Sequence, residues 1–233
     1  MRLNAYLARA GVASRRGADR LIKAGRVKVN GRLGQLNSEI SDNDQVELDG
    51  KEISLQELRY ILLNKPVGYV TTLKDEKSRR KVTNLIDISE RVVPVGRLDY
   101  NTSGALLLTN DGGLAHKLMH PSHEIDKVYE AKVEGTITQE KLNKLSDGIE
   151  LEDGVTAPAR TQKLSDNKIE LIIHEGRNHQ VRRMLAAVDL CVKKLHRSQY
   201  GPLTLGGLKP GQWRYLTPNE VLELKNFDKI ATP

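Results

Sequence analysis

A charged loop between two short apolar runs is the feature that most constrains the fold of this chain. The loop reads G-R-L-D-Y-N-T-S-G at residues 96–104, and the apolar runs are residues 92–95 before it and 105–108 after it. Short apolar runs bounded by turn residues are typical of buried strands. The sequence therefore predicts two strands that hold Arg97 and Asp99 in the turn between them. Reactive groups are often mounted on such loops, although most turn aspartates only cap backbone N–H groups.

The rest of the chain mixes strands and helices without regular alternation. We expect a buried strand from Tyr60 and further strands at 67–72, 105–109, 128–133, 169–173 and 195–197. Helices are expected at 114–119, 139–145 and 179–187. This mixture predicts an α+β domain over residues 59–233, with a largely antiparallel mixed sheet flanked by helices.

The first 32 residues form a strongly basic segment. They hold nine Lys and Arg residues against one acidic residue, Asp19, a net charge of +8, whereas the remainder of the 233-residue chain carries −1. Two short helices are expected there, the second running from Arg15 to Ala24 behind Ser14 as N-cap. Strands at 27–29 and 45–48 follow. A basic module beside a near-neutral one is typical of a nucleic-acid anchor joined to a second activity.

The apolar runs, the first residues and the cysteine content indicate where in the cell this chain acts. No apolar run approaches the roughly 20 residues that a membrane helix needs, and residues 1–4 lead into an amphipathic pattern without a secretory signal. The single cysteine, Cys191, cannot form an internal disulfide. We therefore expect a cytoplasmic protein, acting as a monomer, with no membrane partner.

The charged loop closely resembles the catalytic motif of the RsuA/RluB/RluE/RluF family of rRNA pseudouridine synthases. The resemblance extends over about residues 60–220. It includes L-N-K-P-V-G-Y-V, K-L-M-H-P-S-H-E-I-D-K-V-Y-E-A-K-V and I-H-E-G-R-N-H-Q-V-R-R-M, in the order that the family shows. Residues 1 to about 48 resemble an S4 RNA-binding domain, with S-R-R and G-R-V-K-V-N-G as the best-matching pieces. The resemblance implies an S4 domain and linker over 1–58 and a catalytic domain over 59–233.

The resemblance also implies roles for individual residues. Asp99 corresponds to the essential catalytic aspartate, Tyr129 to the active-site tyrosine and Val181 to the hydrophobic residue beneath the uracil ring. Arg182 corresponds to the arginine that keeps the aspartate ionised, and we expect Arg97 near the phosphates or the space left by the extruded base. We expect RNA contacts from basic residues of both domains, namely Arg15, Arg16, Arg20, Lys23, Arg26, Lys65, Arg177 and Arg183.

Pseudouridylation breaks the N1–C1′ bond of a uridine, turns the uracil and rejoins it through C5. Nothing is oxidised or consumed, so we expect no cofactor and no metal. One ionised carboxylate can assist the cleavage as a nucleophile or as a base. A hydrolytic glycosidase would normally place a second carboxylate across the bond, and the loop offers only Asp99.

The motifs D-Y-N-T-S-G, K-L-M-H-P, I-H-E-G-R-N and L-x-L-x-G-L-x-P-G are most similar to the RluB-like, large-subunit branch. The sequence thus predicts an enzyme that acts on 23S rRNA or pre-ribosomal particles. The alternatives are a 16S rRNA enzyme of the same family and a non-catalytic rRNA-binding or assembly factor. An intact set of Asp99, Tyr129 and Arg182 argues against the last.

Overall fold

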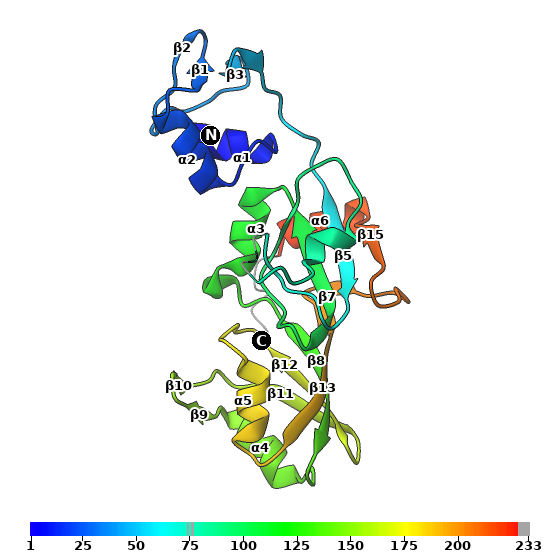
Figure 1. Ribbon diagram of the computed structural model, residues 1–233. Coiled ribbons are helices and arrows are strands. Elements are labelled where there is room, and N and C mark those ends of the chain that lie inside the picture. Colours follow the sequence, from blue (N-terminus) through cyan, green and yellow to red (C-terminus); the bar gives the residue numbers. More distant parts are fainter. Residues whose placement is uncertain (74, 76, 228–233) are drawn as a thin grey trace. The chain divides into compact units, whose positions relative to one another are not determined.

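The chain forms two compact units, which are described separately (Figure 1). The computed structural model describes residues 1–73, 75 and 77–227, so the last six residues of the predicted catalytic domain lie outside it. The first unit comprises Met1–Arg59 with Ile88–Val92 and Asn110–Gly112. The second comprises Tyr60–Asp87, Val93–Thr109 and Gly113–Pro233.

The first unit combines two helices with a small antiparallel sheet. Helix α1 spans Leu3–Arg9 and α2 spans Arg15–Lys23, and the Ser14 hydroxyl caps α2 by accepting a hydrogen bond from Gly17 N at 3.1 Å. The sheet order is β2-β1-β3-β4, with bounds Arg32–Leu33, Val27–Val29, Val46–Leu48 and Lys51–Glu52. Its core is apolar and gathers residues from both helices and the sheet: Leu3, Leu7, Ala18, Ile22, Val27, Ile40 and Val46.

Asn30 and Gly31 form the turn between β1 and β2. Both residues have positive φ, 50° and 76°, as a type I′ hairpin turn requires. Helices α1 and α2 and strands β1 and β3 lie where the sequence places them, with boundary shifts of one residue, whereas β2 and β4 were not predicted. Local signals suffice here because each element carries its own cap or turn residue.

A nine-stranded mixed sheet organises the second unit. Its main path runs β11-β12-β8-β13-β7-β5-β15, while β14 pairs with β13 and β6 with β7. Every neighbouring pair is antiparallel except β13 and β7, which are parallel. In path order the strands are Arg160–Ser165, Lys168–Ile173, Lys127–Glu134, Cys191–Tyr200, Thr102–Thr109, Tyr60–Lys65 and Trp213–Tyr215, followed by β14 (Leu203–Thr204) and β6 (Val93–Pro94). A separate two-stranded hairpin joins β9 (Glu150–Leu151) and β10 (Gly154–Val155).

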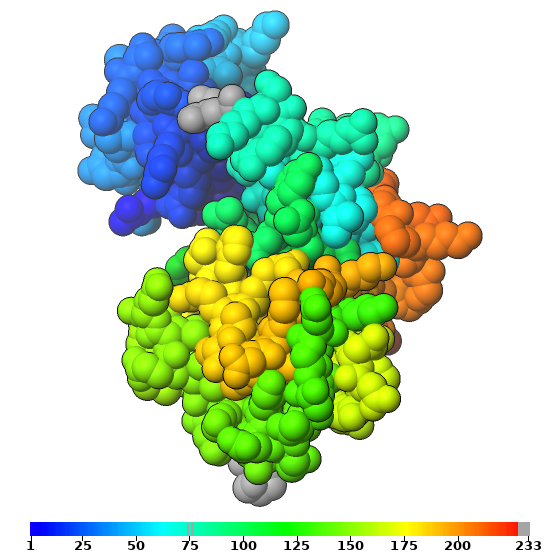
Figure 2. Space-filling view, turned by 60° about the horizontal axis from the view of Figure 1, so that its bottom comes forward, coloured from blue at the N-terminus to red at the C-terminus, as the bar shows by residue number. Residues whose placement is uncertain are grey.

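Helices flank this sheet. Figure 1 shows α4 (Gln139–Asp147) and α5 (Gln180–Ala186) beside the half of the sheet that contains β11, β12, β8 and β13. Figure 2 shows the same half from another side, where green segments and yellow to orange segments pack side by side. Helix α3 (Gly112–Met119) packs through Leu114, Ala115 and Leu118 into an apolar core that also contains Leu107 of β7. The predicted α+β class with a largely antiparallel sheet is confirmed.

Two sequence predictions need correction. The strand expected at 67–72 is absent, and Val70 makes only an isolated bridge to Lys81, because Gly68 takes φ 83° and turns the chain after Pro66. Helix α6 (Pro218–Lys225) was missed although Thr217 and Glu220 form a complete capping box at its start. No helix in the described part of the chain has the length and apolarity that crossing a bilayer requires.

Candidate active site

Lys65, the last residue of β5, holds the loop that carries Asp99 by hydrogen bonds to its backbone. Its side chain is fully buried, and Nζ donates hydrogen bonds to the carbonyls of Pro66, Asp99 and Thr102 at 3.1, 3.0 and 2.8 Å. Burial lowers the pKa of Lys65 to about 8, against the opposing attraction of Asp99. The predicted contact of Lys65 with the RNA backbone stays untested; in this structure its ammonium is enclosed and bonded to three carbonyls.

Further backbone contacts complete the frame of the loop. Gly68 N donates to the carbonyl of Tyr100 at 2.9 Å, and the Thr71 hydroxyl donates to the carbonyl of Leu98 at 2.7 Å. Leu98 is 4% exposed, so the residue between Arg97 and Asp99 is anchored in the protein interior. The loop is thus a fixed platform for Asp99.

One row of the sheet connects this platform to the rest of the site. Tyr129 of β8 pairs with Arg197 of β13, Arg197 pairs with Gly104 of β7, and Gly104 pairs with Lys65 of β5. Side chains that are paired across a sheet emerge on the same face. The row therefore places Tyr129, Arg197 and Lys65 on one face, with Gly104 between the two cations.

Gly104 lets the two parallel strands come close. Its φ is 115°, and a Cβ atom there would lie 2.1 Å from the carbonyl oxygen of Arg197 and 2.6 Å from its nitrogen. Only glycine meets both demands without displacing the backbone. The close pairing of β7 with β13 thus requires the glycine at the end of the T-S-G motif.

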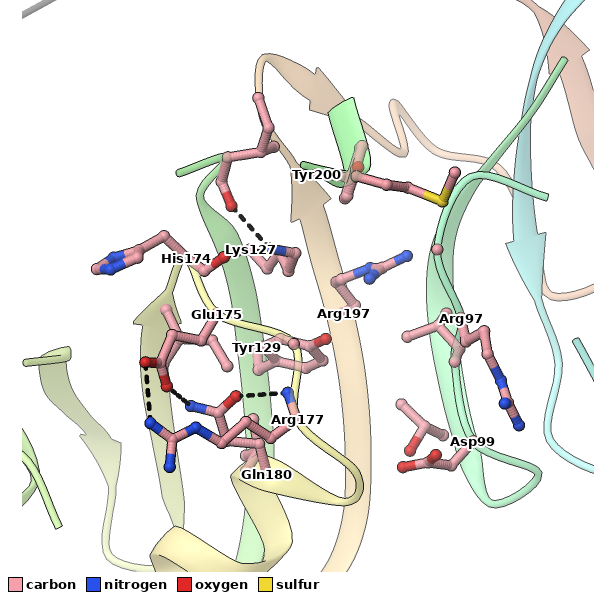
Figure 3. Close-up of a pocket in the computed structure, with 18 of the residues that line it drawn as sticks. Arg97, Asp99, Lys127, Tyr129, His174, Glu175, Arg177, Gln180, Arg197 and Tyr200 are labelled. Carbon is pink, nitrogen blue, oxygen red and sulfur yellow. Dashed lines mark hydrogen bonds and ion pairs between the residues drawn. The ribbon is translucent and has the colours of Figure 1, made fainter. Parts of the chain in front are cut away.

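A cavity of about 850 Å³ opens over this row (Figure 3). Its wall includes the loop that carries Asp99 between β6 and β7, the start of β8, the second half of β13, and the segment leading into α5. The polar and aromatic side chains that line it are those of Arg97, Asp99, His120, Lys127, Tyr129, His174, Glu175, Arg177, Asn178, His179, Gln180, Arg197 and Tyr200. The volume is in the range of pockets that take a small organic group such as a nucleotide.

Three of the residues predicted to bind the substrate line this cavity together with Asp99, namely Arg97, Tyr129 and Val181. Tyr129 is 9% exposed and Val181 4%, as walls of a pocket should be, whereas Arg97 is exposed. Figure 3 shows Tyr129 and Asp99 on opposite sides of the space between them. An aromatic face and a carboxylate across a cavity could hold a planar base between them.

Among the described residues, His179 has an ionisable side chain within 4 Å of the Asp99 carboxylate. His179 Nε2 lies 3.8 Å from Asp99 Oδ1, and one third of the Asp99 side chain (33%) is exposed. His179 precedes α5 with a left-handed φ of 49°. This conformation is uncommon for a residue with a side chain, and here it occurs in the wall of the site.

Arg182 does not form the predicted ion pair with Asp99 in this structure. Its Nη2 donates to the carbonyl of Asn101 at 2.9 Å, and its Nη1 to the carbonyl of Val192 at 3.4 Å. These carbonyls belong to the loop that carries Asp99 and to the start of β13. Arg182 therefore braces the loop two residues beyond Asp99.

Arg177 and Arg183 are occupied by the β9–β10 hairpin. Arg183 Nη1 and Nη2 form a two-pronged pair with Asp153 at 2.9 and 2.8 Å, which lowers the pKa of Asp153 to about 2. Arg177 donates to the carbonyls of Gly154 and Val155 at 2.7 and 2.6 Å. The prediction that both contact RNA is untested, and their visible function is to tie the hairpin to the start of α5.

The basic residues predicted on the first unit are all exposed. Arg26 is paired with Asp49, and Arg15 donates to Asn4 at 3.5 Å. They project from α2 or just after it, and their contacts with RNA remain predictions: Arg15, Arg16, Arg20, Lys23 and Arg26.

The cavity residues that the sequence reasoning did not assign include Lys127, Arg197 and Tyr200. Lys127 lies two positions before Tyr129 on β8, so strand alternation could have placed it on the same face. Arg197 could not be found in that way, because only the pairing of β13 with β8 and β7 brings it beside Tyr129.

Comparisons with known proteins agree with this geometry. The family described as RNA pseudouridylate synthase matches residues 59–187, and the S4 domain family matches residues 1–46. The chain is 50% identical over 232 residues to ribosomal large subunit pseudouridine synthase B of Bacillus subtilis, covering 96% of this chain and 95% of that one. It is 35% identical over 227 residues to the dual-specificity RNA pseudouridine synthase RluF of Escherichia coli, covering 96% and 78%.

A solved structure described as a pseudouridylate synthase superimposes with a TM-score of 0.71 at 32% identity, covering 96% of this chain and 99% of that one. Sequence and fold therefore both resemble those of pseudouridine synthases over nearly the whole length of the chain. With Asp99 on a fixed loop, facing a tyrosine across a cavity, the chain belongs to the RNA pseudouridine synthases and carries an N-terminal S4 domain.

Proposed function

We propose that this enzyme converts one or a few uridines of ribosomal RNA to pseudouridine, and that its substrate is the 23S rRNA of the large subunit. The observation that carries the proposal is the likeness over the full chain to an enzyme whose name specifies the large ribosomal subunit, at 50% identity. The pocket supports uridine conversion, because a cavity of about 850 Å³ lined by Asp99 and by the ring of Tyr129 fits an extruded uracil.

Asp99 is the residue to which we assign the chemistry. Its carboxylate is carried by the fixed loop and lines the cavity, where a bound nucleotide could reach it. We propose that Tyr129 stacks on the uracil, that Val181 supports its other face, and that Arg97 contacts the adjoining phosphate. The first unit would anchor the RNA through the exposed basic residues of α2, independently of the target base.

The experiment uses unmodified transcripts of 23S and 16S rRNA, incubated with the enzyme and then mapped by carbodiimide-dependent stops of reverse transcription. We expect new stops in the 23S transcript and none in the 16S transcript. Stops confined to 16S rRNA would replace the proposed substrate by its alternative. Mapping rRNA from cells with and without the gene covers targets that exist only in pre-ribosomal particles, and no difference there would favour a non-catalytic assembly factor.

A further inference from the structure

Arg197 is a buried cation in the wall of the active site. It is 2% exposed, and its Nε donates to the carbonyl of Ala105 at 2.8 Å. Its Nη2 is enclosed and has no hydrogen-bond partner, and Arg197 takes part in none of the ion pairs found among the described residues. A buried charge without a counter-charge is costly and is seldom kept without a function.

Aromatic rings surround the guanidinium. Its Cζ lies 4.9 Å from the ring centroid of Tyr200 and 6.0 Å from that of Tyr129, and Figure 3 shows Arg197 between these two side chains. Burial raises the pKa of Tyr200 to about 12, so its phenol stays neutral. The rings therefore shield the cation from water without neutralising it, which preserves its electric field in the cavity.

One further cation, Lys127, lines the same cavity, and Lys65 lies on the same sheet row without lining it. Lys127 Nζ donates to the carbonyls of Ile125 and His174 at 3.0 and 2.5 Å, and burial together with the charge of Arg197 lowers the pKa of Lys127 to about 8. Arg197 also lowers the pKa of Lys65, after the larger effect of burial. Arg197 and Lys127 thus place two positive charges on the cavity floor, each bonded to neutral carbonyls. The carboxylates of Asp126 and Glu175 act on Lys127 more weakly than burial and Arg197 do.

The reaction supplies the missing negative charge. When the N1–C1′ bond of uridine breaks, its electron pair stays on N1 and spreads to the two ring carbonyls, while Asp99 either bonds to C1′ or removes the C2′ proton. C5 then bonds to C1′, either as the Asp99–C1′ bond breaks or as Asp99 returns its proton to C2′. The C5 proton leaves and N1 takes up a proton, so the product is an isomer. By either route the uracil ring becomes anionic.

We propose that Arg197, assisted by Lys127, stabilises the anionic uracil ring during cleavage of the N1–C1′ bond. This inference rests on pseudouridine synthesis by this site and assigns the electrostatic group that drives its first step. The effect acts through a low-dielectric floor and requires no direct hydrogen bond to the base. An arginine suits the role because its charge does not depend on pH in the physiological range.

The test measures single-turnover conversion at saturating enzyme, with whichever rRNA transcript the wild-type enzyme modifies. The transcript contains either uridine or 5-fluorouridine at the target, and conversion of the N-nucleoside is followed by mass spectrometry of digested, heat-denatured RNA. Fluorine withdraws electrons and stabilises the ring anion, so it should substitute in part for the lost cation. Arg197→Met removes the charge, and Arg197→Lys keeps it.

We expect Arg197→Met to slow conversion of uridine by about 100-fold, as loss of one preorganised electrostatic group typically does. The defect should be at least about fivefold smaller with 5-fluorouridine, and RNA affinity should change by less than about threefold, because phosphate contacts dominate binding. Arg197→Lys should stay within about tenfold of wild type. Lys127→Met should show a smaller defect with the same fluorine dependence, and Lys194→Met, an exposed position on the same strand, should show none.

The idea is overturned if Arg197→Met changes only affinity, or if its defect is equal for the two nucleosides, since a purely structural role would affect both alike. If that variant does not fold, as judged by circular dichroism, Lys127→Met decides by the same comparison of nucleosides. A wild-type enzyme that converts neither rRNA would instead count against the proposed substrate.

Discussion

Replacing Gly104 by alanine tests whether the close pairing of β7 with β13 requires a glycine at this position. An alanine Cβ would lie 2.1 Å from the carbonyl oxygen of Arg197, so the two strands must separate by about an ångström, and the residue must also hold φ 115°. The unfavourable backbone conformation costs about 1–2 kcal/mol and the overpacking about 1–3 kcal/mol. Together they lower the free energy of unfolding by about 2–5 kcal/mol.

For a protein of this length each kcal/mol shifts the melting temperature by about 2–4 °C. We therefore expect the main thermal transition, followed by circular dichroism, to fall by about 4–20 °C. Conversion of rRNA at saturating enzyme should also fall, by about 10²-fold, because a separation at Gly104 moves Lys65 and the Asp99 loop away from Arg197.

Gly112→Ala provides the matched control. Gly112 begins α3, and a Cβ there meets nothing within 4 Å, so the change should leave stability unchanged or raise it by less than about 1 kcal/mol. If Gly104→Ala melts within about 2 °C of wild type and keeps full activity, the close approach does not constrain the site and the reasoning fails.

Three other perturbations follow from the same structure. Asp99→Asn keeps the size of the side chain and removes its charge, so tritium release from 5-tritiated uridine in rRNA should become undetectable while RNA affinity changes less than about tenfold; near-normal release would dismiss Asp99 from the chemistry. Glu220→Gln should erase an acid-sensitive part of stability. The hydrogen bonds from Arg214 lower the pKa of Glu220 to about 2 from 4.5, so the wild-type advantage, about 1 kcal/mol after allowance for solvent screening, should be complete above pH 4.5 and vanish as the pH falls toward 2. Urea unfolding at several pH values measures it, and a pH-independent difference would contradict the assignment. Finally, replacing three exposed basic residues of α2 by glutamine should weaken RNA binding and flatten its salt dependence in filter-binding assays, whereas an unchanged slope would remove α2 from the anchor: Arg16, Arg20 and Lys23.

The loop that carries Asp99 and the main elements of the first unit could be predicted because each has a local signal. The loop of Asp99 lies between two apolar runs, and Ser14 and the Asn30–Gly31 pair mark the ends of their own elements. Such signals act within a few residues, so tertiary packing has little chance to override them.

The electrostatics of the site depend on contacts between distant segments and could not be predicted in this way. Lys65 and Arg182 both carry the charge expected of RNA-facing or aspartate-facing groups, yet both donate to backbone carbonyls of the loop. Nothing in the sequence says whether a basic side chain will meet a phosphate, a carboxylate or a carbonyl. That choice is made by strand pairing and helix placement.

The hydrogen bonds that hold residues 99–102 of the loop end on its main chain. Carbonyl oxygens of four successive residues accept from Lys65, Gly68 and Arg182, and no side chain of Tyr100 or Asn101 takes part in these bonds. The shape of the loop is therefore independent of the side chains at positions 100 and 101. Evolution can change these two residues to suit a new RNA context beside the reactive carboxylate without moving it, so one catalytic frame can serve enzymes with different targets.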